Sequence, residues 1–145
     1  MSASNPSTPA TLPASDGAAH VACTLHICTS CRSPGTPREP RTSRPGFVLY
    51  KQVRDALEAS SLRHRVKLKP AECLSVCPRP CGIALSWPGA WTYLFGDQEP
   101  NATVDDIMKC VALFIESPDG YMSRDARPKS LQASILGRVP PVRGA

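Results

Sequence analysis

Five of the seven cysteines in the sequence fall into two tight groups. Two residues separate Cys28 from Cys31, and three residues separate each neighbouring pair among Cys73, Cys77 and Cys81. Short loops with such spacings allow several sulfurs to point at one metal ion or one iron–sulfur cluster. The predicted ligands are Cys28, Cys31, Cys73 and Cys77. Cys81 is interpreted as a spare thiol beside the site, with replacement of one of these four as the alternative.

The cysteine count favours metal binding over disulfide bonds. Seven is an odd number, so the cysteines cannot all pair within one chain. The amino-terminal residues lack the positively charged start and the apolar run of a secretory signal. We therefore expect a reducing, cytoplasmic compartment, where grouped thiols bind metal or do redox chemistry more often than they form structural disulfides. No apolar run approaches the roughly 18 residues of a membrane span, so no membrane association is expected.

Composition divides the chain into three parts. A length of 145 residues suffices for one domain with a modest core. Residues 1–20 are mostly Ser, Pro, Ala and Thr with one charged side chain, Asp16, which predicts a disordered leader. The metal-binding domain is expected over residues 21–118, and a basic carboxyl-terminal extension over residues 119–145.

Hydrophobic periodicity predicts an α/β fold with a single sheet. The expected order is strand, helix, strand, β-hairpin and helix, over residues 21–27, 46–62, 66–69, 83–95 and 104–115. A strand–helix–strand crossover is right-handed and makes its two strands parallel, so the loops after both strands emerge at one edge of the sheet. Those loops carry the two cysteine groups. The topology therefore predicts that the groups meet.

The formal net charge of +5 raises the question of an acidic partner. The basic loops contain no interleaved aromatic residues, so nucleic-acid binding is not predicted. Most of the charge is interpreted as solvated. The segment after Gly120 combines basic residues with Leu131, Ile135 and Leu136, which predicts docking of an acidic redox partner. Packing of this segment on the domain's own sheet is the alternative.

The other candidate residues have structural interpretations. Cys23 and Cys110 fall at core positions of a strand and a helix, where a buried cysteine acts as a small apolar residue. His26 is interpreted as a hydrogen-bonded strand residue, with metal ligation as the alternative. The hairpin aromatic residues are predicted to form core: Trp87, Trp91, Tyr93 and Phe95. No Ser-His-Asp set, phosphate-binding glycine loop or pair of carboxylates stands out, so an intrinsic catalytic activity has no support.

Several motifs resemble known families. A cysteine pair after the first strand, Cys-x3-Cys after the second, a hairpin and a terminal helix are similar to the thioredoxin-like [2Fe–2S] ferredoxins. More specifically, residues 24–142 resemble the bacterial DUF1636 family of predicted metal-binding proteins, on the motifs LHICTSCR, CLSVCPRPCGIAL, WTYLFGD, SPDGY, ARP and GRVPP. The resemblance implies a thioredoxin-like fold, a [2Fe–2S] cluster, one-electron transfer to a redox partner protein and a link to cobalamin or cobalt metabolism. The first cysteine pair of the ferredoxins is usually more widely spaced than Cys28 and Cys31.

Two alternatives to an electron carrier remain open. Four thiolates in two close pairs suit tetrahedral zinc equally well, which would make a structural or metal-delivery protein. Cys28 and Cys31 could also work as a dithiol oxidoreductase. Such dithiols depend on a helix amino terminus that stabilises the thiolate, and here more than ten residues separate Cys31 from the expected helix, which disfavours this alternative.

Overall fold

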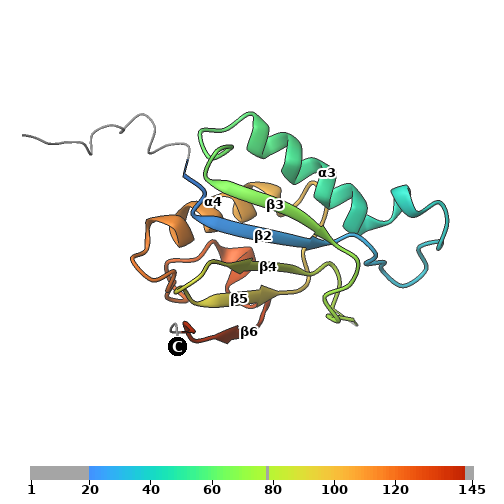
Figure 1. Cartoon of the computed structure of the whole chain (residues 1–145). Coiled ribbons are helices and arrows are strands. Elements are labelled where there is room, and N and C mark those ends of the chain that lie inside the picture. The colour runs from blue at the N-terminus through green and yellow to red at the C-terminus, as the bar shows by residue number, and fades with distance from the viewer. Residues whose placement is uncertain (1–19, 78, 143–145) are drawn as a thin grey trace, which may run out of the picture.

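The computed structural model describes residues 20–77 and 79–142, and the predicted leader lies almost entirely outside this range. Figure 1 shows the arrangement of the elements, labelled β2 to β6 and α3 to α4. In chain order they are β2 (Cys23–Cys28), the 3-10 turn η1 (Arg41–Ser43), α3 (Pro45–Glu58), β3 (Val66–Ala71), β4 (Ile83–Ser86), β5 (Thr92–Phe95), α4 (Val104–Glu116), the 3-10 turn η2 (Lys129–Leu131) and β6 (Ile135–Val139). The predicted mixed α/β class with one sheet is confirmed.

The five strands form one sheet in the order β3-β2-β4-β5-β6, which Figure 1 shows from top to bottom. β2 pairs with β3 in parallel, from Cys23 opposite Val66 to Cys28 opposite Ala71. The other neighbours are antiparallel. β2 is therefore flanked on both sides, by the strand that follows the crossover helix and by the first strand of the hairpin.

One face of the sheet forms the core. Leu25 and Ile27 of β2 are fully buried, whereas Thr24 and His26, which alternate with them, are partly exposed. Both helices pack against β2 and against each other. In α3, buried apolar residues recur every four positions, at Leu49, Val53 and Leu57. The buried positions of α4 are Ile107, Cys110, Val111 and Phe114.

The hairpin aromatic residues are core in part. Tyr93 and Phe95 are fully buried, and their rings stack with centroids 6.0 Å apart. Trp87 is 36% exposed, so the prediction that it belongs to the core is wrong. β4 ends at Ser86, and Trp87 instead opens the turn in which its carbonyl accepts a hydrogen bond from the Ala90 N–H at 3.0 Å.

The segment after Gly120 belongs to the folded core. Leu131 is fully buried, and β6 pairs with β5, so the sheet continues to Val139, beyond the boundary predicted at residue 118. The buried guanidinium of Arg127 donates to the carbonyls of Leu131 at 2.7 Å and Met122 at 3.1 Å, and it lies about 6 Å from the ring centroid of Tyr93. Leu131 therefore lies in the domain's own core, and Ile135 and Leu136 pack against that core, whereas Val139 is exposed.

No helix within residues 20–77 and 79–142 is long and apolar enough to cross a membrane.

Candidate metal centre

The two cysteine-bearing loops leave the sheet side by side. β2 ends at Cys28 and β3 ends at the paired residue Ala71, two residues before Cys73. The N–H of Thr29 donates to the carbonyl of Ala71 at 2.8 Å, and the thiol of Cys28 donates to the carbonyl of Glu72 at 3.7 Å. The right-handed crossover thus brings together segments that are more than forty residues apart, as the sequence predicted.

The antiparallel pairing of β2 with β4 brings a third cysteine to the same edge. β4 runs opposite to β2, so its first residues lie beside the last residues of β2. The N–H of Cys28 donates to the carbonyl of Gly82 at 3.0 Å. Cys81 precedes Gly82, so its backbone lies beside that of the first cysteine pair. The hairpin was predicted from the sequence, but the antiparallel pairing of its first strand with β2 was not, and that pairing is what makes Cys81 a neighbour of the site.

Three buried thiols lie at this edge of the sheet. Cys28, Cys31 and Cys81 are each at most 3% exposed. Cys31 is close enough to Cys28 and to Cys81 to shift the pKa of each. We call these three residues the inner thiols.

Hydrogen bonding distributes the protons unevenly among the inner thiols. The hydrogen bond with Cys31 raises the pKa of Cys28, and burial raises it further. For Cys31, the hydrogen bond with Cys28 lowers the pKa, but the bond with Cys81 and burial outweigh it and bring the pKa to about 11. The hydrogen bond from Cys31 lowers the pKa of Cys81 against the effect of burial. Cys81 is therefore the inner thiol that loses its proton most readily.

Cys73 and Cys77 lie outside this set. Both are exposed, and the sulfur of Cys73 accepts a hydrogen bond from the N–H of Ser75 at 3.2 Å. We call these two residues the outer thiols. The described part of the chain contains no group of three or more His, Cys, Asp or Glu side chains arranged to hold a metal ion. The structure therefore brings Cys28 and Cys31 together, adds Cys81, and leaves the other two predicted ligands on the surface of the adjoining loop.

The loop with the outer thiols is anchored at two points. Val76 is 5% exposed and packs on Gly82, where an added Cβ would lie 2.6 Å from a Val76 methyl carbon. Arg79 forms an ion pair with Asp97 and donates to the carbonyl of Ala133 at 3.2 Å. Cys77 lies between these anchors, and Cys73 lies three residues before the first of them.

The amino terminus of α3 lies against the first cysteine pair. The N–H of Gly46 donates to the carbonyl of Cys31 at 3.2 Å, and a Cβ at position 46 would lie only 2.1 Å from the carbonyl oxygen of Cys28. Although more than ten residues separate Cys31 from α3 in the sequence, the helix is adjacent to the cysteine pair in the structure. The prediction that the helix lies too far from the pair for a dithiol enzyme is therefore wrong. The helix N–H nevertheless points at a carbonyl, and the pKa values of Cys28 and Cys31 are raised, so the nucleophilic thiolate that such an enzyme needs is not stabilised.

Arg44 fastens the loop after the first pair. This residue is 8% exposed, and its guanidinium donates to the carbonyls of Arg38 at 2.9 Å and Ser30 at 3.4 Å. Arg41 also donates to the hydroxyl of Ser30, at 3.3 Å. These bonds tie the arginine-rich loop to the backbone after Cys28, while most residues of the loop are exposed.

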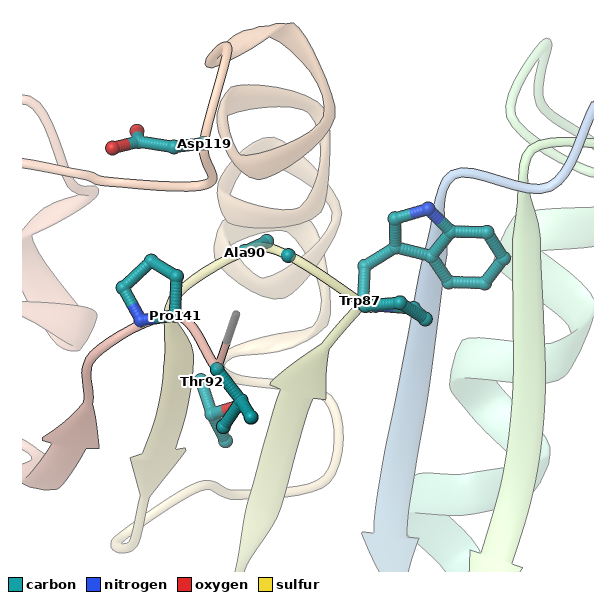
Figure 2. Close-up of a pocket in the computed structure, with 8 residues that line it drawn as sticks. Trp87, Ala90, Thr92, Asp119 and Pro141 are labelled. Atoms are coloured by element: carbon teal, nitrogen blue, oxygen red, sulfur yellow. The ribbon is translucent and has the colours of Figure 1, made fainter. Parts of the chain in front are cut away.

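Cavities differ between the two ends of the sheet. At the thiol end, a pocket of about 580 Å³ is lined by Cys81 and Pro80, and a smaller one of about 190 Å³ by Cys77 and Arg32. A pocket of about 820 Å³ lies at the opposite end, beside the β4–β5 turn. Figure 2 shows its labelled lining: Trp87, Ala90, Thr92, Asp119 and Pro141. No cysteine lines this larger pocket, so the thiol chemistry belongs to the other end.

The remaining candidates lie away from the inner thiols. Cys23 and Cys110 are fully buried among the apolar side chains of the core. Burial raises the pKa of each to about 12. His26 is partly exposed, on the strand face opposite to Leu25 and Ile27.

Comparison with solved structures supports the fold. The chain is similar to the thioredoxin-like [2Fe–2S] ferredoxin from Aquifex aeolicus, with a TM-score of 0.55 and 16% identity over 83% of this chain and 96% of that one. A second structure of that ferredoxin, the wild type, gives a TM-score of 0.52 with 14% identity over 81% of this chain and 98% of that one. A variant with one cysteine replaced by serine gives 0.51 with 15% identity, over 79% and 98%. No curated protein matches the chain.

Residues 25–141 match the family described as "Protein of unknown function (DUF1636)". This match covers most of the chain, from within β2 to beyond the end of β6. The chain therefore belongs to the DUF1636 family, and its fold is that of the thioredoxin-like ferredoxins.

Proposed function

We propose that the protein binds a [2Fe–2S] cluster through cysteines at the carboxyl end of β2 and carries one electron between partners. The proposed ligands are Cys28, Cys31, Cys73 and Cys77. The observation that carries the proposal is the convergence of the two cysteine loops: the buried thiol of Cys28 donates to the carbonyl of Glu72, the residue before Cys73. The likeness in fold to [2Fe–2S] ferredoxins supports the choice of cluster.

The donor set fits such a group. Iron–sulfur clusters and zinc both take four cysteine sulfurs, and this end of the sheet offers five. Cys28 and Cys31 are buried at the end of β2, and the other two proposed ligands, Cys73 and Cys77, are exposed on the loop after β3, which would need to move toward them. When bound, the cluster would supply one-electron redox chemistry.

The chain's own residues would hold the charge of the thiolates. Backbone N–H groups of Ser30 and Leu74 hydrogen-bond to the sulfur of Cys28, and that of Gly82 to the sulfur of Cys31. Such bonds favour the ionised sulfur, so they lower the cost of gathering negative charge at a buried site and shift its reduction potential upward. The folded arginine loop and Val76 would limit access of water.

Zinc is the second candidate occupant. Cys28, Cys31 and Cys81 are buried on segments that meet at the end of β2, and four cysteine sulfurs make a tetrahedral zinc site. A zinc protein would be structural or would deliver metal. We do not propose a dithiol oxidoreductase, because the pKa values of Cys28 and Cys31 are raised.

The proposed partner is a redox protein with an acidic surface, in a cytoplasmic setting. Two exposed arginines, Arg38 and Arg41, and the partly exposed Arg32 lie on the loop that follows the first cysteine pair. Exposed charges of this kind act over a Debye length of about 8 Å at physiological salt, so docking would weaken as salt rises. The family resemblance suggests a pathway connected with cobalamin or cobalt.

The test is the visible absorption spectrum and metal analysis of the full-length protein after anaerobic purification. We expect a brown protein with two irons and two sulfides per chain. The Cys28→Ser variant, purified in parallel, should be colourless. A colourless wild-type protein with one zinc per chain would exclude the cluster and support the zinc candidate, whereas a wild-type protein that retains neither would exclude both.

A further inference from the structure

We propose that the open face of the sheet, together with the pocket beside the β4–β5 turn, binds an extended acidic segment of a partner protein that carries an apolar anchor side chain. The open face is the side of the sheet turned away from α3 and α4. In Figure 1 both helices lie behind the sheet, so this face is turned toward the viewer. The proposed interaction is separate from the metal centre, because the pocket lies at the opposite end of the strands.

The register of the strands identifies the residues of the open face. Thr24 and His26 of β2 alternate with buried apolar residues, and residues paired across neighbouring strands share one face. The described strand residues on this face are therefore Thr24, His26, Lys67, Lys69, Ala84, Ser86, Thr92, Leu94, Gly137 and Val139. All of them are exposed or partly exposed, and most have small side chains. The open face is thus a shallow surface on which an extended chain can lie.

The charge of the open face has one sign. Lys67 and Lys69 of β3 are exposed, and Lys69 is paired in register with His26. None of the described strand residues on this face is Asp or Glu. A second copy stacked face to face would place these lysines against a surface without acids, and residues 1–19 contain only one acidic residue, Asp16. Charge complementarity therefore favours an acidic segment of another protein.

An apolar pocket adjoins one end of the open face. Thr92 of the face contributes to the pocket of about 820 Å³, and apolar residues form most of the remaining lining: Trp87, Pro88, Ala90, Pro141 and Val142. Trp87 is 36% exposed, and Figure 2 shows its indole projecting from the end of β4 toward β2. Walls of this kind suit an apolar side chain. Asp119 also lines the pocket, and its carboxylate disfavours a phosphate group there, so a polypeptide fits better than a nucleic acid.

The register also sets the distance between the anchor and the charges. Consecutive partners across β5, β4, β2 and β3 are Leu94, Ala84, His26 and Lys69. Neighbouring strands lie about 4.8 Å apart, so the basic edge is about 14 Å from β5, the strand that brings Thr92 to the pocket. An extended segment that crosses the strands, at about 3.3 Å per residue, spans this distance in about four residues. We therefore expect acidic residues about four positions from the apolar anchor.

The test is selection of peptides from a random display library on the full-length protein, followed by fluorescence polarisation with the enriched peptide. The enriched peptides should share an apolar residue with acidic residues about four positions away. The double variant Lys67→Gln/Lys69→Gln should bind the enriched peptide about fivefold more weakly, and the difference should shrink at high salt. The matched control Lys51→Gln/Lys109→Gln removes two exposed charges from α3 and α4, on the other side of the sheet, and should bind as the wild type does.

Two further variants test the pocket. Trp87→Ala should weaken binding of the same peptide at least about tenfold, because an aromatic wall of the pocket is lost. Val142→Glu leaves the core intact, since Val142 is 77% exposed, and its carboxylate should repel the acidic peptide and weaken binding as well. Failure to enrich any peptide, enriched peptides without acidic residues, or equal binding by the wild type and all three face and pocket variants would overturn the proposal.

Other occupants of the open face give distinct results that would also overturn the proposal. Self-association of the wild type in sedimentation, lost in the Lys67→Gln/Lys69→Gln variant, would identify a second copy of the chain. Competition by a synthetic peptide of residues 1–19 at the affinity of the enriched peptide would identify the chain's own amino-terminal segment. A single-stranded oligonucleotide that binds more tightly than the enriched peptide, and is lost in the same lysine variant, would identify a nucleic acid.

Discussion

Two sets of buried cysteines occupy the two ends of β2, and they differ in what surrounds them. Cys23 lies at the start of the strand and shares the apolar core with Cys110, and both are fully buried. The inner thiols Cys28, Cys31 and Cys81 lie at the end of the strand and are buried to nearly the same degree. Burial alone therefore does not separate a packing cysteine from a candidate ligand.

The neighbours make the difference. The thiol of Cys110 donates to the sulfur of Met122 at 3.6 Å, and burial among apolar groups keeps both core thiols protonated, with pKa values of about 12. The inner thiols instead have other thiols and backbone N–H groups as partners. The backbone N–H groups lower the pKa values of Cys28 and Cys31 against the stronger effects of neighbouring thiols and burial, and of the inner thiols only Cys81 has a lowered pKa.

The largest predicted difference between the two sets is in metal affinity. Cys28→Ser or Cys31→Ser should weaken metal binding at least about a hundredfold, because a thiolate ligand is lost from a site that has few replacements. Cys23→Ser and Cys110→Ser should leave the affinity within about threefold. Competition with a chelating dye measures all four. Equal losses in both sets would show that the distinction drawn from their neighbours is mistaken.

For stability the order should be reversed, because substitution of a core thiol should destabilise the metal-free protein more than substitution of an inner thiol. In metal-free protein, Cys110→Ser should lower the free energy of unfolding by about 2 kcal/mol, because it buries a hydroxyl whose neighbour, Met122, is a weak acceptor. Cys31→Ser should cost less, since Cys28, Cys81 and the Gly82 N–H offer partners to the new hydroxyl. Urea denaturation of the two variants decides the matter, and a larger loss for Cys31→Ser would reverse the comparison.

The core thiols also predict an alkaline limit to stability. Their pKa is about 12 in the folded state against a usual 9.0, so between these values the unfolded chain has lost protons that the folded chain keeps. Deprotonation then favours the unfolded state. The free energy of unfolding should fall by about 1 kcal/mol for each core thiol by pH 10, and these two thiols should have little effect on it below pH 9. Urea titrations of metal-free protein from pH 8 to 11 measure this slope. Cys110→Ala should reduce it, and an unchanged slope would contradict the assignment.

The smallest predicted effect concerns the loop of the outer thiols. Arg79→Gln removes the exposed ion pair with Asp97 that anchors this loop, so metal affinity should fall about threefold and recover little at high salt. Lys67→Gln, on a strand away from the loop, is a matched charge control. An effect of Arg79→Gln no larger than that of the control would show that Val76 alone holds the loop.

Much of the fold followed from periodicity and one topological rule. The buried spacing of Leu49, Val53 and Leu57 predicted α3, and the handedness of the crossover predicted that Cys28 and Cys73 leave the sheet together. The family resemblance predicted the thioredoxin-like architecture, which the fold comparison confirms. Local patterns of this kind are visible in sequence because each depends on residues a few positions apart.

The remainder depended on contacts distant in sequence. The sequence could not decide whether the segment after Gly120 packs on the domain's own sheet. The pairing of β6 with β5 and the position of Arg127 over the ring of Tyr93 are contacts distant in sequence, and no local pattern in this basic segment predicts them. The approach of Gly46 to the first cysteine pair is hidden for the same reason. At the site, cysteine spacing predicted Cys73 and Cys77 as ligands, and this stays a prediction. The proximity of Cys81 to Cys31 results from the antiparallel pairing of β4 with β2, which joins residues distant in sequence.

The most direct test of the account is differential alkylation of cysteines before and after metal removal. Anaerobically purified full-length protein is treated with iodoacetamide in its native state, with and without prior removal of metal, and mass spectrometry reads the modification at each cysteine. We predict that metal removal makes Cys73 and Cys77 react strongly and exposes Cys28 and Cys31 to slower modification, while Cys23 and Cys110 stay unmodified in both samples because the core protects them. The same pattern in both samples, with Cys73 and Cys77 fully modified from the outset, would contradict a metal centre built from these loops.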